Sequence, residues 1–280
     1  MRTRSGRLLI DCPDRPGLVA TVAAFLAGEG GNITDADQHG ERGHFFMRLA
    51  FDLVDGSNAE TFASRVRDLA ERDGLTIRLG WDDHRPSIAI LASRQDHCLR
   101  DLLFRHDIGE LPGDVAMVVS NHPGPGEAAE RRGLRFVHLP VTPETKAEQE
   151  QALAEVVGDA DLIVLARYMQ ILSPELCARW AGRCINIHHG LLPAFKGGRP
   201  YHQAWERGVK LIGATSHYVT AELDAGPILA QAIEPVGHRD SPDDLVRKGR
   251  DLERQVLATA VRAHLEDRVI VTGQRTVVFE

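Results

Sequence analysis

Cysteine is scarce in this sequence, and its spacing excludes two kinds of framework. The 280 residues include four cysteines, and no two of them stand in a CxxC pair. Disulfide scaffolds and thiolate zinc sites both depend on close, paired spacing. We therefore predict reduced and mostly buried thiols at Cys12, Cys98, Cys177 and Cys184.

The sequence also lacks long runs of like-charged residues and long apolar runs. The formal net charge is -7, and the two signs alternate without the lysine- or arginine-rich block that would neutralise a phosphate backbone. The N-terminus is basic, but only three apolar residues, 8–10, follow before Asp11. That run is far too short for a signal peptide or a membrane span. We expect a cytoplasmic protein that binds neither nucleic acid nor membranes.

Metal-binding patterns are absent despite 13 histidines. No HExxH or similar helical pair occurs. His188 and His189 are neighbours, but adjacent residues on an extended chain point to opposite faces, so the two rings would not readily ligate one ion. The sequence predicts no metal site.

The length favours two domains. The first eighty residues follow the order βαββαβ, which is typical of a ferredoxin-like domain. Its strands are expected near 8–10, 32–39, 45–53 and 75–81, and its helices near 18–26 and 59–69. A polar segment, 82–86, ends in Pro86 and precedes a new apolar run. We therefore predict domains at 1–83 and 84–280.

The second domain alternates strands with helices, which predicts a doubly wound, mostly parallel sheet of the α/β class. Ser173-Pro174 and Ser241-Pro242 are good helix starts, and the second is expected to open a long helix to about Leu265. Strands are expected at 87–92, 115–120, 135–139, 162–166, 185–187 and within 269–279, and the remaining helices at 99–104, 128–131 and 145–157.

Asn186, His188 and Asp224 are the strongest candidates for chemistry. An amide donor and an imidazole two residues apart on an extended segment point to one side and can converge on one developing oxyanion. They stand at the carboxyl end of a predicted strand, where open parallel sheets bind ligands. Asp224 lies on a loop fixed by Ala225-Gly226-Pro227 and could hold the imidazole. Taken singly, Asn186 is also explained as a turn-forming asparagine, His188 as a core histidine and Asp224 as a residue that caps its loop. Together they suggest formyl-group chemistry.

Segments along nearly the whole chain resemble the formyltetrahydrofolate deformylase family. In the predicted first domain, Cys12-Pro13-Asp14-Arg15-Pro16-Gly17-Leu18 with Asn32-Ile33 resembles an ACT domain. In the second, the resembling segments are 120–123, 139–142, 166–173, 186–189, 192–195, 199–204, 213–215, 223–228 and 276–279. Two positions depart from the family pattern: Gly190 stands where serine is more usual, and Ala230 where an acidic residue is common.

The resemblance implies an N-terminal ACT domain followed by a formyltransferase-type sheet domain. It further implies hydrolysis of 10-formyltetrahydrofolate to formate and tetrahydrofolate, which feeds formate to purine biosynthesis and balances one-carbon pools. In that scheme Asn186 and His188 stabilise the tetrahedral intermediate. Asp224 positions and helps to deprotonate water while keeping His188 charged. The folate is the substrate, so neither a cofactor nor a metal is expected.

The resemblance also assigns supporting residues. Thr215 and His217 would support the Asp224 loop, or serve only as cross-strand partners, and the loop Lys196-Gly197-Gly198-Arg199 would border the folate's glutamyl tail or simply be solvated. The pterin pocket would be lined by Tyr168, Met169, Gln170, Ile171, Leu172, Val219, Thr220, Ala221, Glu222 and Leu223. An amino-acid effector, glycine or methionine, would bind in a homo-oligomer joined through the ACT domains, at Asp14, Arg15, Gly17, Leu18, Asn32 and Ile33.

Two other functions stay open. A folate-dependent formyltransferase would pass the formyl group to an amine. In the transferase that acts on a phosphorylated amine, a glycine-rich turn after the first strand holds phosphate. Here the turn Ala92-Ser93-Arg94-Gln95-Asp96-His97 has no glycine, which favours water as the acceptor, although Ser93 and Arg94 could still bind an anion. A catalytically silent folate or amino-acid sensor is the other alternative, but it would gain little from a buried Asn–His–Asp group.

Overall fold

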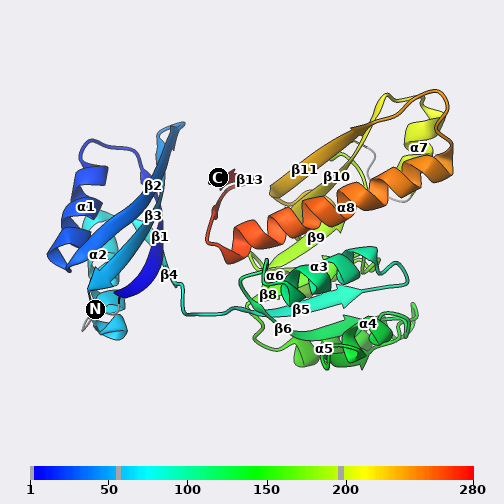
Figure 1. Ribbon diagram of the computed structural model, residues 1–280, viewed down its shortest axis with the longest axis horizontal. Helices are drawn as coiled ribbons and strands as arrows, with labels where there is room; N and C mark the ends of the chain where they lie inside the picture. Colours follow the sequence, from blue (N-terminus) through cyan, green and yellow to red (C-terminus); the bar gives the residue numbers. More distant parts are fainter. Residues whose placement is uncertain (1–2, 55–57, 195–198) are drawn as a thin grey trace. The chain divides into compact units, whose positions relative to one another are not determined.

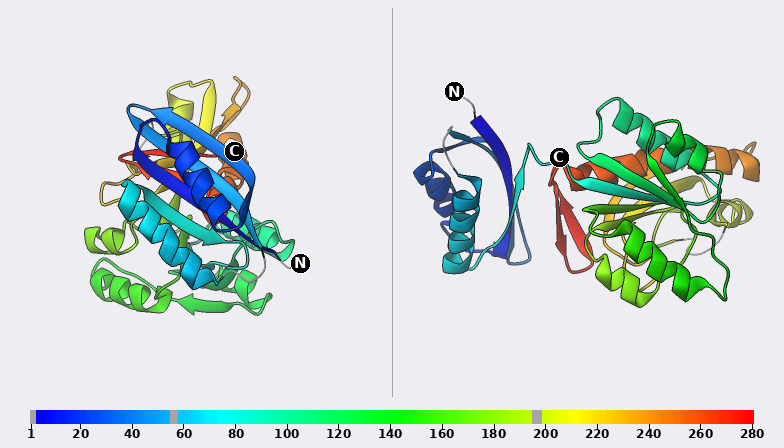
Figure 2. Two further views of the ribbon diagram at one scale, coloured as in Figure 1. Left: turned by 90° about the vertical axis from the view of Figure 1, so that its left-hand side faces the viewer. Right: turned by 90° about the horizontal axis from the view of Figure 1, so that it is seen from below.

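The computed structural model describes residues 3–54, 58–194 and 199–280. The chain folds into two compact units, labelled by their elements in Figure 1 and seen from two further sides in Figure 2. The first unit comprises Met1–Arg85, Asp267–Ile270 and Val277–Glu280, and the second Pro86–Glu266 and Val271–Thr276. The division falls inside the polar segment that precedes the first strand of the second unit. Two short pieces of the C-terminal tail, which the sequence placed with the second domain, belong to the first unit.

The first unit has the predicted βαββαβ order. Its strands form one antiparallel sheet in the order β2-β3-β1-β4. The two helices bury stripes at helical spacing, Leu18, Val22 and Leu26 from one helix and Phe62 and Leu69 from the other. The elements are β1 (Thr3–Pro13), α1 (Leu18–Gly28), β2 (Gly31–Glu41), β3 (His44–Val54), α2 (Ala59–Asp73) and β4 (Thr76–Trp81).

A second apolar cluster in this unit explains why the tail returns to it. Leu9 and Phe46 pack with Ile270 and Phe279 from the C-terminus. Asp267 lies 3.4 Å from Arg7 and 3.4 Å from Arg78. The tail strands β12 (Val269–Thr272) and β13 (Arg275–Val278) pair with each other. Apolar burial and an ion-paired carboxylate thus fix both tail pieces.

The second unit is a seven-stranded sheet in the order β11-β10-β9-β8-β5-β6-β7. Strands β5 to β9 are parallel, β10 runs antiparallel to β9, and β11 runs antiparallel to β10, so the predicted mostly parallel sheet is confirmed. The strands are β5 (Ser87–Ala92), β6 (Asp114–Ser120), β7 (Arg135–His138), β8 (Leu162–Ala166), β9 (Cys184–His188), β10 (Leu211–Tyr218) and β11 (Ile228–Pro235).

Helices cover both faces of this sheet (Figure 1). Ser173 caps α6 and Ser241 forms a capping box with Asp244 at the start of α8, as the sequence indicated. The sequence reading named no helix at α7 and no strand at β10 or β11. The helices are α3 (His97–Asp107), α4 (Gly126–Glu130), α5 (Lys146–Val157), α6 (Pro174–Arg179), α7 (Pro200–Glu206) and α8 (Pro242–Leu265).

The strand order reverses beside β5, which positions the site. The chain runs from β5 outward to β6 and β7, and then returns to place β8 and β9 on the other side of β5. Such a switch point, at the carboxyl ends of the strands, is where open α/β sheets bind ligands. In register, Ala92 lies opposite Ala166 and Leu165 opposite Asn186. The carboxyl ends of β5, β8 and β9 are therefore nearly level.

All four cysteines are buried and free of disulfides, in line with the predicted thiols. No helix in the described part of the chain is both long and apolar enough to cross a membrane.

Candidate active site

The end of β9 carries the first two candidate residues. Asn186 and His188 alternate along the strand and so share one face. The antiparallel neighbour β10 places His217 opposite Asn186 and Thr215 opposite His188. Asn186 Nδ2 lies 3.2 Å from His217 Nε2. Two strands thus present four polar side chains in two facing pairs.

Asp224 meets this group from a loop. Its Oδ2 lies 3.2 Å from His188 Nδ1, and its Oδ1 lies 3.7 Å from His217 Nε2. The backbone of Asp224 is left-handed, with φ 52°. Gly226 lies so close to Tyr218 that a β-carbon would overlap the Tyr218 carbonyl oxygen. This tight turn returns the carboxylate to both imidazoles, so the three residues predicted to act together lie together.

The hydrogen bonds define the protonation of the group. Burial alone would raise the pKa of Asp224, but the hydrogen bond from His188 and the nearby His217 imidazole outweigh it and hold that pKa below its usual range, so Asp224 is ionised at neutral pH. His217 Nδ1 donates to the carbonyl of Tyr218 at 2.8 Å, because a carbonyl can only accept. When neutral, His217 therefore accepts from Asn186 through Nε2, which orients the Asn186 amide.

The two ring nitrogens of His188 face different neighbours. Nδ1 faces Asp224, and Nε2 faces Gly190, where an added β-carbon would lie only 3.0 Å from Nε2. His188 itself is 4% exposed. The absence of a side chain at position 190, one of the two departures from the family pattern, therefore leaves room beside His188 Nε2.

Thr215 supports a different loop from the one expected. Its hydroxyl donates to the carbonyl of Gly190 at 2.9 Å and accepts from the Leu192 amide at 3.0 Å. Gln231 donates to the Leu192 carbonyl and to Thr215, each at 2.9 Å. Thr215 thus holds the segment that follows His188, while His217 contacts Asp224.

A cavity next to Asn186, His217 and Asp224 contains most of the predicted pterin-pocket residues. Two further lining residues, Leu165 and Cys177, were not anticipated. The remaining lining residues are Gln170, Ile171, Leu172, Val219, Thr220, Ala221, Glu222 and Leu223. Ile171 is 62% exposed and Leu223 52% exposed. Large apolar side chains left open to solvent are suited to cover a flat ring.

Tyr168 and Met169 do not line this cavity. Tyr168 is buried in the core beneath the sheet, where its hydroxyl bonds Gln149 at 2.8 Å. Met169 is largely exposed and has a left-handed backbone, with φ 58°. Positions 195–198, which include Lys196, lie outside the described residues.

The predicted effector residues divide into two sets. Asp14, Arg15 and Gly17 are exposed in the turn between β1 and α1, where Gly17 has φ 90°, and Asn32 is exposed on β2. Leu18 is 4% exposed and belongs to the core, and Ile33 packs against that core. The exposed set can contact a ligand, whereas Leu18 and Ile33 support the fold.

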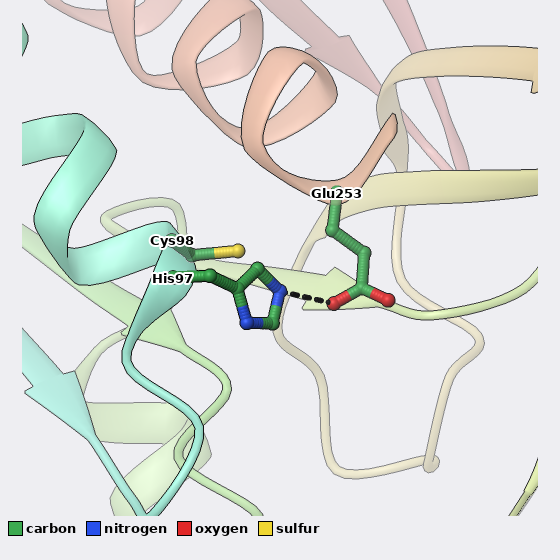
Figure 3. A group of neighbouring side chains, drawn as sticks. All are labelled: His97, Cys98 and Glu253. Atoms are coloured by element: carbon green, nitrogen blue, oxygen red, sulfur yellow. Dashed lines mark hydrogen bonds and ion pairs between the residues drawn. The ribbon is translucent and has the colours of Figure 1, made fainter. Parts of the chain in front are cut away.

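One group with metal-ligand chemistry occurs within the described ranges. His97, Cys98 and Glu253 offer atoms within 4.8 Å of one another (Figure 3). His97 Nε2 already bonds Glu253 at 2.8 Å, and Arg167 Nε lies 3.5 Å from the same carboxylate oxygen. Burial raises the pKa of the Cys98 thiol well above its usual range. A cation would have to displace His97 and approach Arg167, so these residues form an ion-paired cluster instead.

Fold and site together define the class of protein. A formyl transferase family model matches residues 87–261, and an ACT domain model matches residues 6–71. The crystal structure of glycinamide ribonucleotide transformylase 1 from Symbiobacterium toebii has a TM-score of 0.67 and 34% identity, and covers 71% of this chain and 97% of its own. The second unit is a formyl transferase domain, and the first contains an ACT domain.

Two full-length comparisons narrow the class. A formyltetrahydrofolate deformylase from Synechocystis sp. is 46% identical over 100% of both chains. The crystal structure of a formyltetrahydrofolate deformylase from Pseudomonas syringae pv. tomato has a TM-score of 0.96 and 47% identity, and covers 99% of this chain and 95% of its own. The chain belongs to the formyltetrahydrofolate deformylase family.

Proposed function

We propose that this chain hydrolyses 10-formyltetrahydrofolate to formate and tetrahydrofolate, with Asn186, His188 and Asp224 as its catalytic residues. The observation that carries the assignment of residues is the contact of the Asp224 carboxylate with the His188 imidazole, 3.2 Å apart, beside a strand-borne amide. Membership of the deformylase family supports the reaction, and the cavity beside the group supports a ring-bearing substrate.

Each catalytic side chain has a defined part. The water oxygen bonds to the formyl carbon, the bond from that carbon to N10 breaks, and N10 gains a proton. Asp224, ionised and held by two imidazoles, takes the proton from water as the bond forms. Asn186 and His188 Nε2 donate to the developing oxyanion, and one such donor typically contributes ~3 kcal/mol. The fixed amide and imidazole stabilise the transition state more than the planar substrate.

The simplest experiment omits any amine acceptor. Purified chain is mixed with 10-formyltetrahydrofolate alone, and formate and tetrahydrofolate are measured over time. Hydrolysis predicts equal amounts of both products at a rate proportional to protein. A silent sensor would bind the folate without turnover, and an amine transferase would leave it intact until an amine is added.

The fold is shared with a glycinamide ribonucleotide transformylase, so transfer to an amine is the second candidate. The turn after β5 has no glycine, which disfavours a backbone cradle for an acceptor phosphate. Water therefore remains the proposed acceptor.

We propose for the pterin that the loop 219–223 and residues 170–172 line its site. Exposed apolar edges at Ile171 and Leu223 would cover the ring faces, and loop backbone groups would bind its polar edge. Tyr168 would act from beneath the pocket and Met169 at its exposed rim. Isothermal titration of tetrahydrofolate into Leu223→Ala tests this assignment, and an unchanged affinity for the folate would contradict it.

We propose for the first unit an amino-acid effector site and a joint between chains. The exposed turn residues Asp14, Arg15 and Gly17 and the nearby Asn32 are suited to bind a small zwitterion such as glycine or methionine. Strand β2 lies at the sheet edge, with most of its side chains exposed, and an open edge strand can pair with a second copy. Sedimentation with and without each amino acid tests both proposals, and a monomer whose turnover neither amino acid alters would contradict them.

A further inference from the structure

The carboxyl ends of β5 and β8, where a doubly wound sheet is open to a ligand, are here bonded to each other. Ser93, the first residue after β5, donates to the carbonyl of Tyr168 beyond β8. Two residues further on, Gln95 Oε1 accepts from Arg167 Nη2 at 2.7 Å. Two hydrogen bonds thus span the switch-point crevice.

Helix α8 contributes a buried carboxylate to the same group of residues. Glu253 is 1% exposed and accepts hydrogen bonds from His97 at 2.8 Å and from Tyr201 at 3.0 Å. Its carboxylate also lies 3.5 Å from Arg167. Burial alone would raise the pKa of Glu253, but His97 and Arg167 outweigh it and lower that pKa. We name Ser93, Gln95, His97, Arg167 and Glu253 the crevice cluster.

Gln95 accepts a hydrogen bond from the Arg167 guanidinium, the cation of this cluster. Arg167 is 7% exposed, and Gln95 is exposed above it. Within the described residues, Nε and Nη1 of Arg167 make no hydrogen bond, so Gln95 is the hydrogen-bonded partner of the guanidinium. A guanidinium is the side chain best shaped to hold phosphate or carboxylate. Because Gln95 and Glu253 already contact the Arg167 guanidinium, it is not positioned to hold the phosphate or carboxylate of a ligand.

The crevice cluster lies beside the catalytic strand. Arg167 follows Ala166 at the end of β8, and His188 ends β9 at nearly the same level, because Leu165 pairs with Asn186. Neighbouring strands are ~4.8 Å apart, so the two residues are separated by about one strand spacing. The charges of Arg167 and Glu253 both act on His189, the residue after His188. A second reactant that approached His188 from this side would meet the cluster.

We propose that the crevice cluster makes water the acceptor by denying an anionic amine its anchor. The inference rests on the proposed hydrolysis and concerns only the choice of acceptor. The related fold serves a glycinamide ribonucleotide transformylase, and a ribonucleotide carries a phosphate. With an amine as acceptor, its nitrogen would bond to the formyl carbon and lose a proton, while the bond to N10 breaks and N10 gains one. The turn after β5 has no glycine to hold that phosphate through backbone amides, so a cation would have to hold it, and the Arg167 guanidinium is bonded to Gln95 and lies beside Glu253.

The experiment measures how the formyl group divides between two acceptors. The full chain, Gln95→Ala and Gln95→Ser receive 10-formyltetrahydrofolate with either O-phosphoethanolamine or ethanolamine, and formylated amine and formate are both quantified. Uncovering Arg167 should raise the ratio of formylated O-phosphoethanolamine to formate by about tenfold, which corresponds to ~1.4 kcal/mol. Ethanolamine, which has no phosphate, should give no comparable rise. Gln95→Ala should also become sensitive to inhibition by inorganic phosphate.

A matched control is available on α5. Gln151 is exposed and donates to Glu155 at 3.2 Å, remote in sequence from the crevice cluster. Gln151→Ala should leave the product ratio unchanged. If either Gln95 variant is folded by its melting curve and releases formate, yet forms no more formylated O-phosphoethanolamine than the original chain, the inference is wrong. Absence of formate from the original chain would instead overturn the proposed hydrolysis.

Discussion

Two charged clusters stand at one edge of the second unit's sheet, and they differ in what each leaves for a ligand. At the end of β9, Asp224 contacts two imidazoles beside a cavity, and His188 Nε2 faces the open side of Gly190. At the ends of β5 and β8, Glu253 contacts an imidazole, a phenol and a guanidinium, and is 1% exposed. A buried carboxylate with a lowered pKa therefore does not by itself identify a catalytic group. The feature that distinguishes Asp224 is that it lines a cavity.

The largest expected effect concerns the catalytic carboxylate. Asp224→Asn keeps the shape of the side chain but removes the base and the counter-charge for His188, so turnover should fall by roughly 10²–10⁴. The dissociation constant for tetrahydrofolate should change little. Stopped-flow rates and folate titration measure the two quantities. Asp251→Asn, at an exposed aspartate on α8, is the control, and an equal rate for both variants would remove Asp224 from the mechanism.

The matching change in the crevice cluster should act on stability instead. Glu253→Gln keeps one oxygen but leaves Arg167 without its counter-charge in the interior, and breaking a buried ion pair typically costs ~3–5 kcal/mol. Denaturant unfolding measures the loss. Turnover per folded molecule should fall far less than in Asp224→Asn. Glu155→Gln, at an exposed position on α5, should unfold like the original chain. A Glu253→Gln variant of full stability and lost turnover would reverse the contrast between the two clusters.

A smaller effect is expected at Gly249, one helical turn before Glu253 on α8. A β-carbon there would overlap the ring of Tyr201, whose hydroxyl bonds Glu253. Alanine normally favours a helix by up to ~1 kcal/mol over glycine, but overpacking costs about 1–3 kcal/mol. Gly249→Ala should therefore lower the melting temperature. Gly28→Ala, at a helical glycine with open space, should not lower it. Equal changes in melting temperature in both variants would show that the Tyr201 ring is not packed tightly against Gly249.

The smallest effect is a pH dependence. The pKa of Asp224 is lowered in the folded chain, so its contribution to stability is fully present above the ordinary value of 3.8 and is lost as the pH falls towards the folded pKa. The difference in melting temperature between the original chain and Asp224→Asn should therefore be constant near neutrality and shrink below about pH 4. A difference that grows in acid would mean that burial, and not the two histidines, dominates at Asp224.

Local patterns predicted most of the fold because most of its elements are periodic. The βαββαβ order, the parallel strands and the capped starts of α6 and α8 all follow from spacing and turn residues. Helix α7 escaped prediction because no capping side chain marks its start: Arg199 precedes Pro200 and makes no cap hydrogen bond. Strand β11 is an edge strand in which Ala230, Ala232 and Glu234 are poor strand formers. The return of the tail to the first unit depends on contacts such as Leu9 with Phe279, which no local pattern carries.

The candidate site was predictable in part for the same reason. The two-residue spacing of Asn186 and His188 indicated one face, but the contact with Asp224 came from resemblance, since a loop position does not fix a partner. The sequence carried one signal for the hydrogen bond between His217 and Asn186. Thr215 and His217 are two residues apart, a spacing that places both side chains on one face of a strand. No local pattern in the sequence indicated the crevice cluster, because its members are far apart along the chain. Gln95 and Arg167 are 72 positions apart, and His97 and Glu253 are 156 apart.

The most direct measurement follows the acceptor oxygen. The chain turns over 10-formyltetrahydrofolate in water enriched in oxygen-18 with no amine present, and the formate is analysed by mass spectrometry. We predict formate in step with tetrahydrofolate, each molecule carrying one labelled oxygen. Consumption of the folate only after an amine is added would contradict the account.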